Sequence, residues 1–404
     1  MADVERGVDR QQVTGRADVG ARRSRAFPLV GVAGTRGKST TVWLLDAMLA
    51  AAGRASGLWC STGVYVRGVR QPGELGPWSR VLAAVGSGEL DVALQELETE
   101  LVTTVGLPER IYPLASITTL CGNNEDCLVS PEFSRGALAQ TILARAVRPD
   151  GILVLNADDL AVLAAANETA ATPVLFALHP DNPALRRHLE QGGSAVWVAD
   201  GSVVVGDGLD QRAIVPVSEA RFTLDGNLIF QVQNLLCSVA LAAALNVPDA
   251  AIREAVCTFE PDPVRLPGSC NIFYRRGATI LLDAARQVWT LKPLIRGIRH
   301  QPHRRTIIVA GCFSHLPDDQ LVEAGRLLGR LGGVVILHQE PERPAVELLK
   351  EGIAQNEIPP LVLTMPTEQQ AFAHAFRMLN EGDLCLLLTD DVQNAVDAVT
   401  RLEG

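Results

Sequence analysis

One short stretch near the start of the chain constrains its fold more than any other. The segment "LVGVAGTRGKSTTVWLL" (29–45) joins an apolar run to a glycine turn, then to Gly-Lys-Ser-Thr and a second apolar run. This order predicts a buried parallel strand over 27–33 and a helix from Ser39 to about Ala52, closed by Gly53. Such a turn suits an anion, because glycines let successive backbone N–H groups converge and the helix adds its N-terminal partial charge.

The side chains of this turn indicate a nucleotide and a divalent ion. Lys38 supplies a full positive charge for the β- and γ-phosphates of ATP, and the Ser39 hydroxyl suits Mg²⁺. The strict G-x-x-x-x-G-K-[ST] pattern fails at one position, where Val32 replaces the first glycine. The alternative interpretation is an ordinary strand–turn–helix corner, although a corner has no need of Gly-Lys-Ser-Thr.

A phosphate loop that uses magnesium needs a second ligand, usually an acid at the end of a neighbouring strand. Glu96 ends the apolar run "LDVALQE" (90–96) and is the best candidate. Glu98 and Glu100 are alternatives, and a solvated acidic turn is the interpretation without function. We therefore predict that Ser39 and Glu96 hold the metal ion.

The chain beyond this loop alternates between strand-like and helix-like segments, which predicts an α/β protein. Asp-Gly pairs within 195–206 and 222–232 predict tight hairpins, and hence a small antiparallel addition to a mainly parallel sheet. A second doubly wound α/β unit is predicted after Pro267-Gly268. The buried strands expected in the first unit are 90–96, 115–120 and 151–157. Strand-like runs are expected in the second unit at 278–283, 305–311, 333–338, 361–365 and 383–389.

The domain boundary is expected near 265–275, because "PDPVRLPG" (261–268) holds three prolines and one glycine. We predict a disordered leader over 1–26, which is rich in Arg, Asp, Gly and Gln. A nucleotide-binding domain is predicted over 27–268 and a Rossmann-like domain over 269–404.

Composition excludes some partners and leaves others open. The net charge of −10 over 404 residues argues against nucleic acid or an anionic membrane as the main partner. No apolar run approaches the ~20 residues of a membrane span. Eight cysteines without a C-x-x-C pair indicate neither a zinc site nor a disulfide framework. A cytoplasmic protein is therefore expected.

Several segments resemble the Mur ligase superfamily. The loop "GTRGKSTT" is similar to the superfamily's ATP loop, whose usual form is G-T-N-G-K-[ST]-T. The segments 146–159, 258–273 and 382–392 are similar, in this order, to the ligase module of cyanophycin synthetase. The "RGKST" motif is equally similar to the poly-γ-glutamate synthase branch. The resemblance implies a P-loop Mur-ligase central domain followed by a Rossmann-like C-terminal domain.

The resemblance also implies a reaction, its cofactors and its site. Family members use ATP and Mg²⁺ to phosphorylate a carboxylate, and an amine then attacks the acyl phosphate to form an amide. Cations must neutralise the transferred phosphoryl group, and a closed site must exclude water. The partners expected are small-molecule carboxylate and amine substrates, with a homodimer or a partner ligase as candidate assemblies. The implied nucleotide-binding residues are Gly34, Thr35, Arg36 (for the usual Asn), Gly37, Lys38, Ser39, Thr40, Asn234 at the adenine, and Asp283.

Other positions depart from the family pattern. Cys127 stands where a histidine near magnesium is usual, Gln140 where many members carbamylate a lysine, and Ser269 where an arginine is expected. We predict that Arg265 and Arg286 supply the missing positive charge and act with Lys38 in catalysis. Two hypotheses remain: a diverged ligase for an amino acid or acidic peptide, and a non-catalytic Mg-ATP-binding pseudo-ligase that supports a partner protein.

Overall fold

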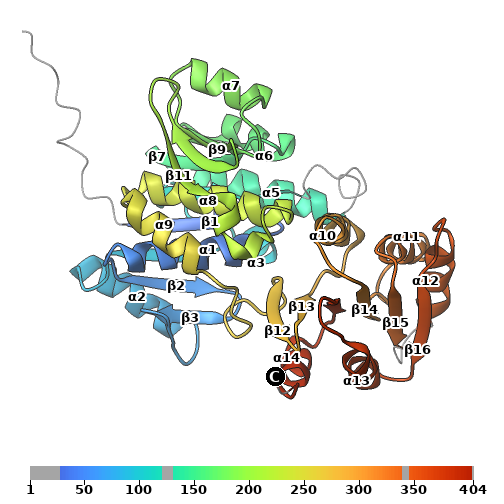
Figure 1. The fold of residues 1–404 in the computed structure, drawn as a ribbon. Helices are drawn as coiled ribbons and strands as arrows, with labels where there is room; N and C mark the ends of the chain where they lie inside the picture. Colours follow the sequence, from blue (N-terminus) through green and yellow to red (C-terminus); the bar gives the residue numbers. More distant parts are fainter. Residues whose placement is uncertain (1–27, 121–130, 339–344, 403–404) are drawn as a thin grey trace, which may run out of the picture.

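The computed structural model describes residues 28–120, 131–338 and 345–402. The leader expected over 1–26 and the position of Cys127 lie outside these ranges. The described residues form two separate sheets, each with helices on both faces (Figure 1). The predicted α/β fold class is confirmed, including the antiparallel strands added to a mainly parallel sheet.

The first sheet has eleven strands, in the order β11-β10-β9-β8-β7-β6-β1-β5-β2-β3-β4. Its middle, from β9 across to β2, is parallel, whereas the strands at both ends are antiparallel. The strands are β1 (Leu29–Ala33), β2 (Ser56–Cys60), β3 (Gly63–Val66), β4 (Val69–Arg70), β5 (Val92–Glu96), β6 (Tyr112–Ile117), β7 (Val147–Asn156), β8 (Thr172–Ala177), β9 (Ala195–Ala199), β10 (Ser202–Gly206) and β11 (Gln211–Pro216).

Helices bury apolar side chains against both faces of this sheet, which makes two cores. One face is covered by α1 (Lys38–Ala51), α8 (Ile229–Ala244) and α9 (Asp249–Thr258). The other is covered by α2 (Leu75–Ser87), α3 (Thr99–Val105), α5 (Pro131–Ala146), α6 (Leu160–Ala164) and α7 (Pro183–Glu190). Short 3₁₀ turns occur at η2 (Ala165–Glu168), η3 (Val217–Glu219) and η4 (Arg221–Thr223).

The second sheet has six strands, in the order β12-β13-β17-β14-β15-β16, and only β12 is antiparallel to its neighbour. Its strands are β12 (Asn271–Arg275), β13 (Ala278–Asp283), β14 (Thr306–Ala310), β15 (Val334–His338), β16 (Leu361–Met365) and β17 (Leu384–Leu388). One face packs against α10 (Val288–Arg299), α11 (Asp318–Gly329) and α12 (Ala345–Ala354), and the other against α13 (Glu368–Met378) and α14 (Val392–Thr400). Among the described helices, none combines the length and apolar character that crossing a bilayer requires.

The strands predicted from apolar runs are present, but one predicted hairpin is wrong. Asp200 and Gly201 do turn β9 into β10, both with positive φ. The segment 222–232 instead forms a 3₁₀ turn, a left-handed bend and the start of α8. Its Asp225-Gly226 pair turns the chain as predicted, but the apolar residues that follow repeat at helical spacing and are buried along α8.

A buried carboxylate joins the ends of β6 and β7. Asp159 Oδ2 accepts hydrogen bonds from the Leu120 N–H (2.6 Å) and the Thr119 hydroxyl (2.8 Å). Its Oδ1 accepts from two N–H groups in the first turn of α6 (3.2 and 3.3 Å). Burial raises the pKa of Asp159, and these hydrogen bonds oppose the shift. The side chain therefore caps a helix and fixes the strand ends at the carboxyl edge of the sheet.

We predict that Asp159→Ala lowers the free energy of unfolding by about 3 kcal/mol, because it removes the cap and leaves buried N–H groups unpaired. Urea unfolding followed by circular dichroism is the measurement. The control is Asp150→Ala, which removes an exposed carboxylate that pairs with Arg148 and should change stability little. Equal effects of the two substitutions would contradict this account.

Candidate functional site

The phosphate-loop sequence lies at the carboxyl edge of the first sheet, between the end of β1 and the start of α1. Its neighbours there are the ends of β5 and β6, which flank β1 on both sides. Gly34 (φ +132°) and Gly37 (φ +88°) adopt backbone conformations that favour glycine. A Cβ on Gly34 would lie 2.1 Å from Thr118 Oγ1, and one on Gly37 would lie 2.0 Å from Asn234 Oδ1. Both glycines are therefore required by conformation and by space.

The end of β6 braces the loop through threonines. The Thr118 hydroxyl donates to the Arg36 carbonyl (2.6 Å), and the Thr35 N–H and hydroxyl both donate to the Thr119 carbonyl (2.8 and 3.1 Å). Thr119 is held in turn by Asp159. The N-cap residue of α1 is Gly37, which has no side chain that could cap the helix. The N–H groups in the first turn of α1 lack partners within the helix, so they suit an anion such as a phosphate.

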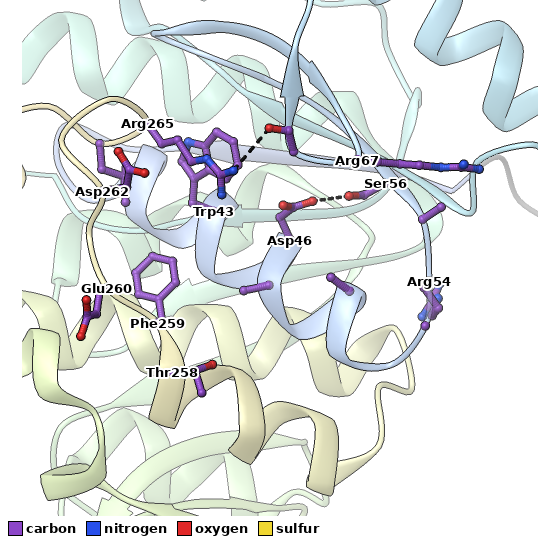
Figure 2. Close-up of a pocket in the computed structure, with 16 residues that line it drawn as sticks. Trp43, Asp46, Arg54, Ser56, Arg67, Thr258, Phe259, Glu260, Asp262 and Arg265 are labelled. Carbon is purple, nitrogen blue, oxygen red and sulfur yellow. Dashed lines mark hydrogen bonds between the residues drawn. The ribbon is translucent and has the colours of Figure 1, made fainter.

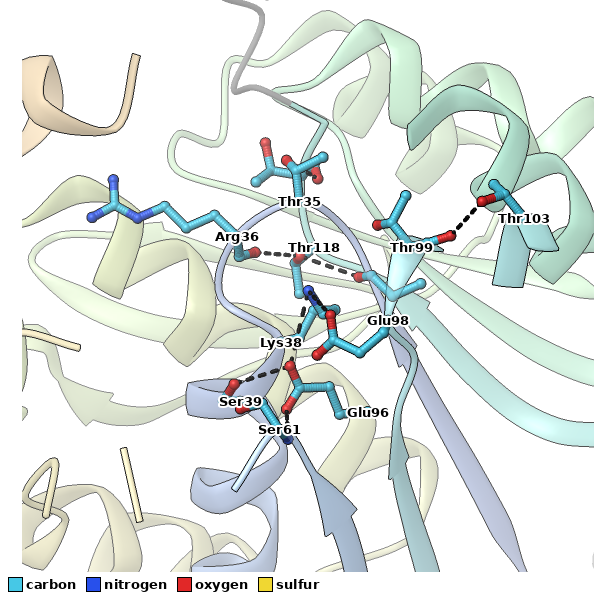
Figure 3. A network of polar contacts seen from close by, with 12 residues as sticks. Thr35, Arg36, Lys38, Ser39, Ser61, Glu96, Glu98, Thr99, Thr103 and Thr118 are labelled. Atoms are coloured by element: carbon cyan, nitrogen blue, oxygen red, sulfur yellow. Dashed lines mark hydrogen bonds and ion pairs between the residues drawn. The ribbon is translucent and has the colours of Figure 1, made fainter. Parts of the chain in front are cut away.

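Lys38, Ser39 and Glu96 lie together at the mouth of this loop (Figure 3). The Ser39 hydroxyl donates to Glu96 Oε1 (3.0 Å), and the Ser61 N–H donates to Glu96 Oε2 (3.2 Å). Lys38 Nζ lies 3.9 Å from Glu96 Oε1 and 3.9 Å from Glu98 Oε2. Burial, assisted by Glu98, raises the pKa of Glu96 to about 7, although Lys38 and the two hydrogen bonds oppose the shift.

These side chains suit a hard divalent cation beside a triphosphate. A hydroxyl and a carboxylate are the oxygen ligands that Mg²⁺ takes, and the ion usually keeps waters and phosphate oxygens in its other positions. The described residues contain no cluster of three or more His, Cys, Asp or Glu side chains that would form a closed metal site. Glu96 is nearly inaccessible to solvent, so its charge requires a cation close by.

Arg36 leaves the loop and reaches the second half of the chain. Its guanidinium lies 3.6 Å from the centroid of the Phe230 ring on α8 and donates to the Thr290 carbonyl on α10 (3.1 Å). In Figure 3 its side chain extends away from Lys38. The same charge opposes the rise that burial causes in the pKa of Asp283. Arg36 therefore links the phosphate loop to the elements around the second sheet.

Asn234, Asp283 and Thr40 are all buried near this link. Asn234 packs against Gly37, and its amide donates to Gln231 Oε1 (2.9 Å). Asp283 ends β13, where Oδ2 accepts from the N–H (3.1 Å) and thiol (2.9 Å) of Cys270. The predicted roles of Asn234 and Asp283 toward the nucleotide stay predictions.

The two arginines predicted to replace the family's missing charge lie elsewhere. Arg265 packs over the Trp43 ring, 5.0 Å from its centroid, and donates to the Gly68 carbonyl (3.4 Å). Arg265 lines a cavity of about 540 Å³ along α1. Figure 2 shows the Arg265 side chain near Asp46. Arg286 is half exposed and pairs with both carboxylate oxygens of Asp390 (2.8 and 3.1 Å). Within the part of the chain that the structure describes, these contacts of Arg265 and Arg286 do not involve Lys38, Ser39 or Glu96, and the catalytic role of both arginines remains a prediction.

Gln140 is buried within α5, and neither polar atom of its amide has a hydrogen-bond partner among the described residues. The amide carries no charge, so it cannot replace a carbamylated lysine as an anionic ligand. Cys127 lies outside the described residues. Sequence reasoning missed the bracing Thr118 and Thr119, although they follow an apolar strand just as Glu96 ends one.

Comparison with known proteins supports this interpretation of the loop. No family model matches the chain. It is 25% identical over 390 residues to cyanophycin synthetase from Trichormus variabilis, covering 95% of this chain and 43% of that protein. The chain thus spans less than half the length of this relative. It is 29% identical over 271 residues to the UDP-N-acetylmuramoylalanine–D-glutamate ligase of Symbiobacterium thermophilum, covering 65% of this chain and 52% of that enzyme.

A solved structure has the same fold. The bifunctional folylpolyglutamate synthase/dihydrofolate synthase from Yersinia pestis, complexed with AMPPNP and a Mn ion, superposes with a TM-score of 0.64. The match covers 93% of this chain and 89% of that one at 16% identity. The two sequence relatives and the phosphate loop support a place for this chain in the Mur ligase superfamily, and the solved structure shows the same fold.

Proposed function

We propose that this chain is an ATP-dependent ligase that joins a carboxylate to an amine through an acyl phosphate. The observation that carries the proposal is the cluster of Lys38, Ser39 and Glu96 at a braced phosphate loop. We further propose that residues 27–268 bind the nucleotide and that residues 269–404 close over it. The substrates proposed are an amino acid or an acidic peptide as carboxylate, and an amino compound as amine.

Each side chain of the cluster has a definite part in this proposal. Lys38 would neutralise the phosphoryl group during its transfer, and the N-terminus of α1 would hold the remaining phosphate oxygens. Ser39 and Glu96 would hold a divalent ion, which supplies further positive charge at the phosphates when bound. Arg36 would keep the second unit close to the loop, so that water is excluded from the reactive intermediate.

A second candidate function is a pseudo-ligase that binds Mg-ATP and supports a partner protein. The observation in its favour is the placement of Arg265 and Arg286, whose guanidinium groups contact Trp43 and Asp390 and not the phosphate loop. Because the Arg36 side chain is directed to Thr290 and Phe230, Lys38 is left as the positive charge at the loop. This is less positive charge for a transferred phosphoryl group than the family pattern implies. The two functions differ in turnover and agree on nucleotide binding.

The first prediction concerns the loop itself. Gly37→Ala should weaken Mg-ATP binding at least tenfold for two reasons. The new Cβ would clash with the Asn234 side chain, and residue 37 has a left-handed backbone conformation that disfavours alanine. Titration calorimetry is the measurement. Gly37→Ala should cost less ATP affinity when it is added to Asn234→Ala than when it is added to the wild type, since the clash is then absent.

A matched control separates the clash from backbone strain. Gly88 also has positive φ (+80°), but no atom lies within 4 Å of the position of its Cβ. Gly88→Ala should therefore reduce stability by about 1 kcal/mol and leave ATP binding unchanged. Unaltered ATP affinity in Gly37→Ala, or in Lys38→Ala, would show that the loop does not bind the nucleotide.

The second prediction separates ligase from pseudo-ligase. ADP release should be weak with ATP alone and rise several-fold when the correct carboxylate and amine are both present, because only an amine resolves the protected acyl phosphate. The screen combines amino acids and short acidic peptides and records ADP together with product mass. Tight ATP binding without turnover under every combination would instead favour the pseudo-ligase.

The third prediction concerns Gln140. Carbamates form from CO₂ on lysine and not on a glutamine amide, so removing CO₂ from the buffer should leave ADP formation by this protein unchanged. A folylpolyglutamate synthase or Mur ligase that is shown to carry a carbamate serves as the positive control. A marked dependence on CO₂ in this protein would mean that another residue has taken the place of the lysine.

A further inference from the structure

A groove on the second unit, far along the chain from the phosphate loop, is lined by positively charged side chains and by no negatively charged ones. It is a cavity of about 420 Å³ between α13 and α14, which lie side by side in Figure 1. This volume is within the range of ligand pockets. Its lining residues are Arg276, Gln369, Phe372, Ala373, Phe376, Arg377, Asn394, Ala398, Arg401 and Leu402.

The charge of this lining is unusual for the chain. It contains three arginines and no acidic residue, although the whole sequence has a net charge of −10. Arg276, Arg377 and Arg401 are exposed, and among the described residues none of them has an ion-pair partner. The acids on the adjoining helices are engaged, since Glu368 accepts from Thr389 and Asn394, and Asp397 accepts from Gln393. The groove therefore suits an anionic ligand.

The fold places the three arginines at one end of the groove. Arg276 sits with Gly277 in the tight turn between β12 and β13, where both residues have positive φ. α13 follows β16 and α14 follows β17, so both helices begin at the carboxyl edge of the sheet and end at the opposite edge. Arg377 and Arg401 lie at these ends. The positive charges are thus gathered at the amino edge of the sheet.

The remainder of the groove suits a peptide backbone better than a string of phosphates. Its floor is apolar, with Phe372 and Phe376 stacked at a centroid distance of 6.2 Å. At the far end, the amides of Gln369 and Asn394 offer both donors and acceptors, which match peptide groups. Methylene and backbone atoms can cover the floor while carboxylates reach the arginines.

The amide end of the groove meets the carboxyl edge of the second sheet. Asn394 donates to Glu368 Oε2 (3.1 Å), and Glu368 Oε1 lies 3.9 Å from His338 Nε2 at the end of β15. In open α/β sheets, ligands bind in the crevice at this edge. A chain lying in the groove would thus extend from the arginines toward the edge where a substrate is expected.

We propose that the groove between α13 and α14 binds an acidic peptide, whose carboxylates pair with Arg276, Arg377 and Arg401. Its identity as a substrate or product strand rests on the proposed ligase function. The existence of the site rests only on the groove and its charge. The groove anchors the peptide by residues beyond the one that reacts, so longer acidic peptides bind more tightly than single amino acids.

The test is fluorescence anisotropy of a labelled oligoglutamate with the full chain, without ATP. Each of Arg276→Glu, Arg377→Glu and Arg401→Glu should weaken binding about tenfold, because a charge-assisted pair becomes a repulsion. The matched control reverses three exposed arginines of the first unit, Arg80, Arg186 and Arg187, and should leave binding unchanged. Equal loss in this control would overturn the proposal, since any surface charge would then suffice.

Two further arms test the groove and the ligand class. Ala373→Trp fills the groove from an exposed position without changing charge, and it should weaken binding as much as one arginine reversal. Inorganic polyphosphate and oligothymidylate serve as competitors. If either displaces the peptide at lower concentration than unlabelled oligoglutamate, or if Ala373→Trp binds normally, the acidic-peptide assignment is wrong.

The proposal and the ligase function can fail separately. Lys38→Ala should abolish ATP-dependent turnover and retain oligoglutamate binding, because the groove lies outside the phosphate loop. Turnover of single amino acids without any peptide binding would overturn the groove and leave the ligase. Arginine-dependent peptide binding without turnover would support the groove and contradict the ligase function.

Discussion

The hydrogen bonds between the end of β6 and the phosphate loop are the constraint on which the site depends. Thr118 and Thr119 bond the loop backbone at Arg36 and Thr35, and Asp159 fixes Thr119 from behind. Because β1 lies between β5 and β6, the same geometry brings Glu96 to the Ser39 hydroxyl. A loop held on both sides loses little freedom when it binds an anion, which favours affinity.

The outline of the site followed from the sequence, because it depends on local patterns. An apolar run, a glycine turn and Gly-Lys-Ser-Thr specify a strand, a loop and a helix within 23 residues, 29–51. Glu96 could be placed beside Ser39 because both follow parallel strands, whose carboxyl ends share one edge. The hairpin predicted over 222–232 is wrong, since Asp-Gly within an apolar stretch also occurs at a turn that leads into a helix, here α8.

The partners of the arginines could not be obtained in this way. Arg36 bonds a carbonyl 254 residues away, Arg265 packs on Trp43, and Arg286 pairs with Asp390. Each contact depends on how distant segments approach one another. A guanidinium on a long flexible stem can reach several alternative acceptors. Motif alignment gives the position of such a residue along the chain and leaves the direction of its charged group undetermined.

The reach of Arg36 has a thermodynamic consequence. Arg36 contributes its backbone to the phosphate loop and its side chain to contacts with Phe230 and Thr290, so the proposed nucleotide site and the contact with the second unit share one residue. Any ligand of the second unit that displaces α10 therefore alters the free energy of the loop. If the loop binds ATP as proposed, then by linkage ATP alters the affinity for that ligand by the same factor. Under the proposed function, the arginine that stands where the family usually has asparagine would couple nucleotide binding energetically to the second unit.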